Sequence, residues 1–130
     1  MATDPIFYTV PYQSQTQFST ANTARDGTGT LATIVDNNAG STPIRIDRIR
    51  LSATTTTTAG KIRWFWDDGT NVRYYTAFDV QAITATATVE PWQIVLNFPR
   101  GLIVKAGWRL KFSTHNAETF NAEAEGATPS

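Results

Sequence analysis

Only a few side chains in this sequence have the chemistry of a catalytic group. The single imidazole belongs to His115, in Ser-Thr-His-Asn-Ala-Glu, where a hydrolytic triad would combine it with Glu118 and a serine. No Gly-x-Ser-x-Gly nucleophile elbow accompanies it. We therefore expect His115 to be a histidine at a strand end or in a loop that makes ordinary hydrogen bonds.

Two pairs of carboxylates are the other candidates for chemistry. Asp67 and Asp68 are adjacent and would suit calcium or the paired acids of a glycosidase. Adjacent strand residues point to opposite faces, however, and Asp-Asp-Gly is common in turns, so we expect a turn. Nothing in the spacing of Asp79 and Glu90 singles them out. With one histidine and no cysteine, zinc is disfavoured, and we expect no catalytic residue, metal or cofactor, hence no enzyme.

Aromatic side chains offer a different function, the stacking of sugar rings. Phe65, Tyr75 and the four tryptophans could form such a platform on a small β-domain. The tryptophans alternate in phase with aliphatic residues, which favours a place in the core. A glycan-binding module therefore stays as the alternative to a purely structural role.

The composition limits the kinds of partner that the protein is expected to bind. Among 130 residues, eleven are basic and eleven acidic, so the formal net charge is zero and general electrostatic binding of nucleic acid is disfavoured. No apolar run approaches the roughly 20 residues that cross a bilayer, and the first residues lack the pattern of a secretory signal. The absence of cysteine fits assembly in a reducing cytoplasm. We expect neither nucleic acid nor a membrane as partner.

A β-hairpin is predicted for the segment that contains the paired acids. Ile62, Trp64 and Trp66 alternate with Lys61, Arg63 and Phe65, and a second alternating run follows at 72–78. The turn between the runs contains Gly69, which readily adopts a positive φ. One face of the hairpin is predicted to be buried, and the other mixes charged and aromatic residues.

Similar alternation along the chain predicts the remaining elements. It occurs at 92–98, 108–112 and 120–124, and no segment has a convincing apolar period of 3.6 residues. Within 44–51 the apolar residues change parity near Asp47–Arg48, which a β-bulge there would correct. About eight short strands predict an all-β fold, an antiparallel β-sandwich or jelly roll.

The charge distribution divides the chain into three parts. Every Lys and Arg lies between Arg25 and Lys111. We predict that residues 1–24 are an N-terminal arm or an added strand, that 25–125 form the sandwich body, and that 126–130 are a flexible tail. For the first part, a strand on the domain's own sheet and an arm that reaches a neighbouring molecule are both open.

Three stretches of the chain resemble small structural proteins of tailed bacteriophages. They are I-D-R-I-R-L, T-T-T-T-A-G-K-I-R-W-F-W-D-D-G-T-N and A-G-W-R-L-K-F-S-T-H-N-A-E-T-F-N, within residues 28–123. Several such proteins are capsid decoration, or cement, proteins, which commonly form trimers with jelly-roll or sandwich bodies on the outside of the head. The resemblance implies a non-enzymatic virion protein, a homotrimer on the outer surface of the head, which is assembled in the host cytoplasm.

The expected partner of such a protein is the major capsid protein, bound across adjacent capsomers. A tail or fibre-associated module that recognises host glycan is the alternative. Apolar residues near the N-terminus would lie in a groove of the shell or pair with a neighbour's strand edge. The outward face of the hairpin would either be solvated or meet a partner, whose carboxylates its arginines would bind. The predicted interface residues are Ile6, Phe7, Tyr8, Val10, Tyr12, Arg63, Phe65, Arg73 and Tyr75.

Overall fold

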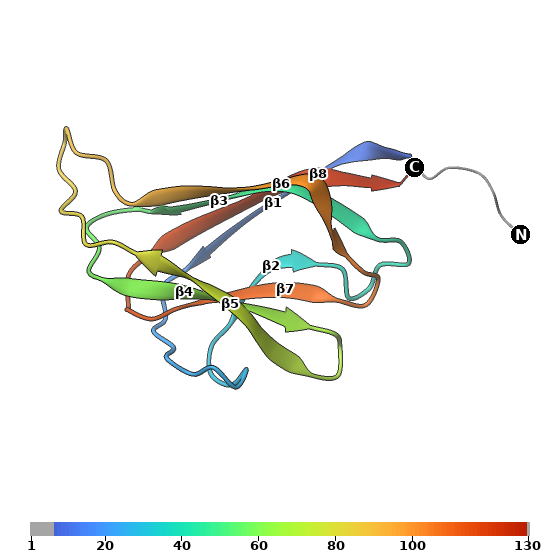
Figure 1. Ribbon diagram of the computed structural model, residues 1–130, viewed down its shortest axis with the longest axis horizontal. Coiled ribbons are helices and arrows are strands. Elements are labelled where there is room, and N and C mark those ends of the chain that lie inside the picture. Colours follow the sequence, from blue (N-terminus) through green and yellow to red (C-terminus); the bar gives the residue numbers. More distant parts are fainter. Residues whose placement is uncertain (1–6, 130) are drawn as a thin grey trace, which may run out of the picture.

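Two antiparallel sheets pack face to face in the computed structural model, which describes residues 7–129 (Figure 1). Sheet A has the strand order β1-β8-β3-β6, and sheet B has the order β2-β7-β4-β5. The strands are β1 (Tyr8–Phe18), β2 (Ala32–Asp36), β3 (Ile44–Ala53), β4 (Gly60–Asp67), β5 (Val72–Val80), β6 (Gln93–Val104), β7 (Arg109–Thr114) and β8 (Phe120–Pro129). The predicted all-β sandwich is confirmed. The described residues contain no helix that is long and apolar enough to cross a membrane.

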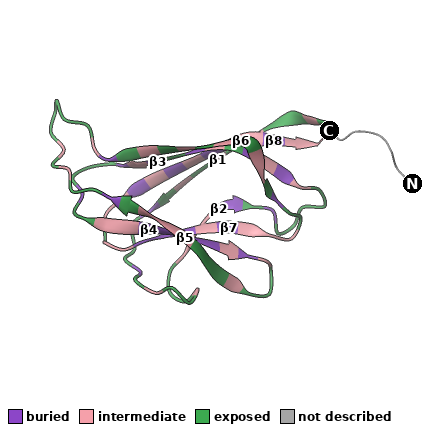
Figure 2. Cartoon of the chain, viewed as in Figure 1, coloured by how far each residue is buried: buried purple, intermediate pink, exposed green. Residues whose placement is uncertain are grey.

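The hydrophobic core lies between the two sheets and is built from alternate strand residues. Ile49 and Leu51 of sheet A and Leu110 and Phe112 of sheet B are fully buried and belong to one cluster. Figure 2 shows buried residues within the strands, while the connecting loops are largely exposed. Burial of each such side chain stabilises the fold by about 1.5–3 kcal/mol.

A β-bulge at Asp47 corrects the parity of β3, as the sequence predicts. The pairing of β3 with both β6 and β8 shifts between Ile46 and Arg48. Because of this shift, the apolar side chains on both sides of the bulge point into the core. They are Ile44, Ile46, Ile49 and Leu51, all of them buried.

Residues 8–18 form β1, an edge strand of sheet A that pairs with β8 along its length. The sequence left open whether the first 24 residues are an arm or a strand added to the domain's own sheet. Residues 8–18 are such an added strand. The strand belongs to the same sandwich as the residues after Arg25. Residues 1–6, and with them the predicted interface residue Ile6, lie outside the described part of the chain.

Hydroxyl groups of β1 close one side of the sandwich. Ser14 Oγ donates to the carbonyl of Ile34 at 2.8 Å, and Thr16 Oγ1 donates to that of Thr33 at 3.1 Å. Both carbonyls belong to β2, the edge strand of sheet B. These polar side chains therefore join the two edge strands on this side of the molecule.

Residues 126–129 belong to β8, which corrects the prediction that a flexible tail begins at residue 126. Gly126 and Ala127 pair with β1 on one side and with β3 on the other. Their small side chains carry little hydrophobic signal, because the segment is held mainly by main-chain hydrogen bonds to two neighbours. Residue 130 lies outside the described part.

Candidate contact surfaces

The structure divides the described members of the predicted interface among three surfaces. The outer face of sheet B carries Arg63 and Phe65, the edge strand β5 carries Arg73 and Tyr75, and the beginning of β1 carries Phe7, Tyr8, Val10 and Tyr12.

Arg63 and Phe65 are buried, which corrects their prediction as contact residues. Their exposed fractions are 4% and 0%. The connection from β1 to β2, residues 19–31, crosses the outside of sheet B (Figure 1). The backbone N–H of Asn22 donates to a carbonyl of β7 at 2.8 Å, and a Cβ at Gly27 would meet a carbonyl of β5 at 2.7 Å. Alternation in β4 predicts the outward face correctly but contains no information about the segment that covers it.

The β4–β5 hairpin departs from simple alternation at a second bulge. Trp64 pairs with Thr76 and Phe65 pairs with Tyr74, so Tyr75 is the extra residue on β5. The ring of Tyr75 therefore lies on the core side, 5.1 Å from the ring of Trp64 between centroids. Strict alternation through 72–78 would place Tyr74 on the same face as Phe78, but its ring packs edge-on against Phe65 at 5.9 Å. The prediction that Tyr75 shares a face with Phe65 is wrong, although Tyr75 is 60% exposed.

The aromatic edge, as we define it, comprises Trp66, Tyr75, Phe98 and Trp108. Trp66 lies 6.4 Å from Tyr75 and 5.9 Å from Trp108 between ring centroids. Phe98 of β6 meets Trp64 of β4 edge-on at 6.1 Å. β5 and β6 end their respective sheets, and no strand pairing joins them within residues 7–129. Trp64 thus connects Tyr75 of β5 with Phe98 of β6 on the open side between these strands, and the four rings of the aromatic edge remain at least partly exposed.

The beginning of β1 presents a second apolar surface. Phe7 is 65% and Val10 is 45% exposed, whereas Tyr12 packs against the core. The Arg45 guanidinium lies over the ring of Tyr8, 5.1 Å from its centroid. Figure 1 places the beginning of β1 at the same end of the sandwich as the β4–β5 and β6–β7 turns. The two apolar surfaces therefore lie toward one end of the molecule.

The paired acids form the hairpin turn, which confirms their predicted role. Asp67 Oδ1 accepts a hydrogen bond from the N–H of Gly69 at 2.9 Å. Asp68 Oδ1 accepts from the N–H groups of Thr70 and Asn71 at 2.9 and 2.7 Å. Both carboxylates thus satisfy backbone donors within the turn.

Asp67 also holds two cations of β7. Its Oδ2 lies 3.0 Å from Lys111 Nζ and 3.7 Å from Arg109 Nη1. Burial of the Asp67 carboxyl acts to raise its pKa, but the hydrogen bond from Gly69 and the charges of Lys111 and Arg109 outweigh burial and keep the pKa below its usual value. Asp67 is therefore an ionised structural group.

His115 forms no triad. Its Nδ1 lies 3.2 Å from Arg63 Nη1, and Nδ1 must accept because a guanidinium can only donate. Glu118, the acid of the imagined triad, instead accepts from the N–H and the hydroxyl of Thr58, each at 2.8 Å. The prediction of a histidine with ordinary hydrogen bonds just after a strand is confirmed.

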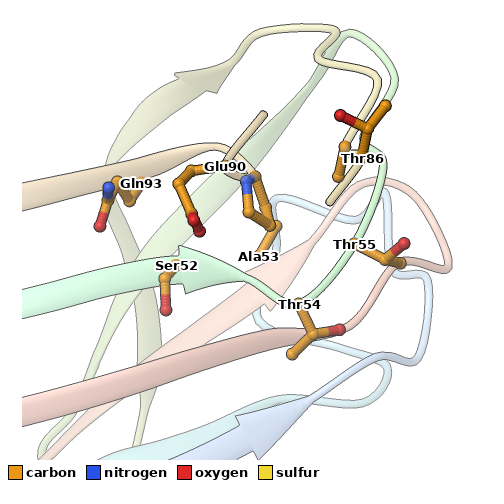
Figure 3. Close-up of a pocket in the computed structure, with 9 residues that line it drawn as sticks. Ser52, Ala53, Thr54, Thr55, Thr86, Glu90 and Gln93 are labelled. Carbon is orange, nitrogen blue, oxygen red and sulfur yellow. The ribbon is translucent and has the colours of Figure 1, made fainter. Parts of the chain in front are cut away.

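A polar pocket of about 590 Å³ lies between the end of β3 and the residues before β6 (Figure 3). Glu90 is its one carboxylate, and hydroxyls such as those of Ser52, Thr54 and Thr86 line the remainder. Asp79 lies elsewhere, in an ion pair with Lys61. Within residues 7–129, no group of three His, Cys, Asp or Glu side chains is placed to hold a metal ion. The pocket offers hydrogen bonds but no second acid or base.

No protein-family model and no curated protein sequence matches the chain. What this protein does must therefore be inferred from its own residues and surfaces.

Proposed function

We propose that this chain is a non-enzymatic structural protein of a tailed bacteriophage. It sits on the outer surface of the head, binds the major capsid protein across adjacent capsomers and thereby stabilises the capsid. It is a homotrimer, is assembled in the host cytoplasm, and binds neither nucleic acid nor a membrane. The resemblance of residues 28–123 to small phage virion proteins supports this proposal.

We infer further that the sandwich is a jelly roll, the body that the resemblance implies. A jelly roll contains eight strands in two sheets, connected as Greek keys. The nested antiparallel pairs β1·β8, β2·β7, β3·β6 and β4·β5 support this inference. They are the pairs that arise when one long hairpin, with the β4–β5 turn at its tip, rolls up.

The observation that carries the proposal is that the sandwich exposes two apolar surfaces, the aromatic edge and the beginning of β1. Tyr75 is 60% and Phe7 is 65% exposed, and Tyr75 continues into the partly buried rings of the aromatic edge. Exposed apolar patches on soluble domains mark interaction sites, and aromatic residues are enriched at the centres of interfaces. Many copies on one shell would combine modest contacts into stable attachment.

Tyr75 and Tyr74 provide a matched pair of variants for testing the proposal. They are adjacent and both exposed, but Tyr75 belongs to the aromatic edge and Tyr74 packs on the opposite face against Phe65. Each purified protein is added to phage heads that lack the protein, and bound copies are measured by sedimentation. We expect Tyr75→Ser to weaken binding at least about tenfold, as at an interface hot spot, while Tyr74→Ser binds like wild type.

Cryo-electron microscopy of the intact particle tests the location independently. Density for trimers on the outer surface of the head is the expected result. Absence of the protein from the head would contradict the capsid role, whereas equal binding by both tyrosine variants would contradict a contact through the aromatic edge.

The alternative function, recognition of host glycan on the tail, also depends on the aromatic edge. Trp66, Tyr75 and Trp108 form a partly exposed group of rings, against which sugars could stack. Phe65 is fully buried and takes no part in such a platform. A glycan-array signal that Tyr75→Ser removes and Tyr74→Ser retains, together with density on the tail, would favour this alternative.

A further inference from the structure

A second pocket lies on the outer side of sheet B, next to the β1–β2 connection. Its volume is about 350 Å³, within the range of about 300–1,000 Å³ that is common for small-molecule sites. The connection contributes Arg25 to it, the beginning of β4 contributes Lys61 and Arg63, β5 contributes Asp79, and the residue after β7 is His115.

The charges around this pocket are unbalanced. Three cations and one carboxylate line it, and the carboxylate of Asp79 already forms an ion pair with Lys61. The salt bridges formed within residues 7–129 include neither Arg25 nor Arg63. Arg25 and Arg63 therefore line the pocket without a carboxylate of residues 7–129 within salt-bridge distance.

Arg63 is the buried member of this group. It is only 4% exposed, its Nε is buried without a hydrogen-bond partner, and the one bond of its guanidinium goes to His115 Nδ1. Removing a guanidinium from water is costly unless hydrogen bonds and an opposite charge compensate for it. A negatively charged acceptor, rather than a further donor, would compensate the buried guanidinium of Arg63.

We propose that the pocket binds a small oxyanion, a carboxylate or a phosphate group, with Arg63 as its main ligand. The planar guanidinium offers parallel N–H donors, which match two oxygens of such a group. Because Nδ1 of His115 accepts from Arg63, the donor that this ring can offer a ligand is the N–H at Nε2. Arg25, which is exposed on the connection, adds a cation at the pocket. This site is separate from the aromatic edge and does not depend on the capsid role.

Nuclear magnetic resonance of the arginine Nε–H groups tests the site on the full chain. Inorganic phosphate, sulfate and acetate are each titrated at constant ionic strength, with chloride as the compensating ion. The expected result is a saturable shift of the Arg63 Nε–H signal. Saturation by phosphate and sulfate identifies a tetrahedral ligand, and saturation by acetate identifies a carboxylate. Absence of saturation with all three anions overturns the proposal.

Three variants assign the binding to this pocket. Arg63→Met removes the buried charge and should abolish the saturable response of the His115 ring signals. Arg25→Gln, at an exposed position that leaves the fold intact, should weaken the apparent affinity at least threefold. Arg73→Gln, on exposed β5 outside the pocket, is the matched control and should leave affinity unchanged. Equal affinity in wild type and Arg25→Gln overturns the assignment, even if Arg63→Met fails to fold.

Discussion

The carboxylate of Asp67 accepts a hydrogen bond from the N–H of Gly69 at 2.9 Å. It also lies 3.0 Å from Lys111 Nζ and 3.7 Å from Arg109 Nη1. Asp67→Asn removes the charge but keeps the shape of the side chain. We expect it to lower the free energy of unfolding by about 2 kcal/mol at pH 7, since hydrogen bonds to charged groups contribute about 1.5–3 kcal/mol. Urea unfolding followed by tryptophan fluorescence measures the change.

The effect of Asp67→Asn should depend on pH in a defined direction. The pKa of Asp67 is lowered in the folded state, so its stabilisation is fully present above the unfolded-state pKa of about 3.9 and disappears as the pH falls through the folded-state value. The deficit of the variant should therefore shrink below about pH 4. Asp79→Asn is the control, because the exposed ion pair of Asp79 with Lys61 contributes little. An equal deficit at pH 3 and pH 7 would contradict the role given to Asp67.

Single-residue roles were predictable where they depend on sequence neighbours. Asp67 and Asp68 bind backbone groups within the next few residues, so the turn could be recognised directly from Asp-Asp-Gly. Arg63 and Phe65 are buried on the outer face of sheet B, which residues 19–31 cross and where Tyr74 packs against Phe65. No local pattern contains that information.

At the scale of elements, the backbones of β3 and β8 approach each other closely next to the bulge at Asp47. A Cβ at Gly126 of β8 would lie 1.8 Å from the carbonyl oxygen of Arg45, just before the register shift. Gly126→Ala must therefore displace a paired strand, and we expect a loss of about 2–3 kcal/mol in unfolding free energy, as in an overpacked core. Urea unfolding of the variant measures this loss.

Glu123→Ala is the control for Gly126→Ala, because Glu123 lies on the same strand and faces outward with a hydrogen bond from Gln15. Its effect should stay within about 0.5 kcal/mol, as at most surface positions. Similar losses in both variants would mean that the close approach of the two strands does not limit stability.

The two bulges differ in how far the sequence predicts them. The β3 bulge can be recognised in the sequence because apolar and polar residues differ sharply there. Only a parity shift buries Ile44, Ile46, Ile49 and Leu51 together. On β5, Tyr74 and Tyr75 are chemically alike, so either can occupy either face. The bulge between them is decided by packing against Phe65 and Trp64, which sequence alternation does not specify.

The whole molecule has one closed side and one open side. Hydrogen bonds from Ser14 and Thr16 join β1 to β2, whereas the aromatic edge fills the side between β5 and β6. This asymmetry limits how the N-terminal segment can be altered. Because β1 belongs to the closed side, removing its first half affects the sandwich as well as any contact with a partner.

Deletion of residues 2–12 should therefore destabilise the body. It removes the packing of Tyr12 against the core and the pairing of β1 with the last residues of β8. We expect a loss of at least about 3 kcal/mol, which corresponds to a fall of roughly 10 °C in Tm for a domain of this size. Circular dichroism melting measures it, and a wild-type Tm would show that this half of β1 contributes no stability.

The double variant Phe7→Ser and Val10→Ser separates contact from folding. Both side chains are exposed, at 65% and 45%, so their replacement should leave Tm within about 2 °C of wild type. Loss of head binding by this variant would assign the contact to the beginning of β1, which the deletion cannot do. Retained binding by the folded double variant would leave the aromatic edge as the surface that attaches the protein to its partner.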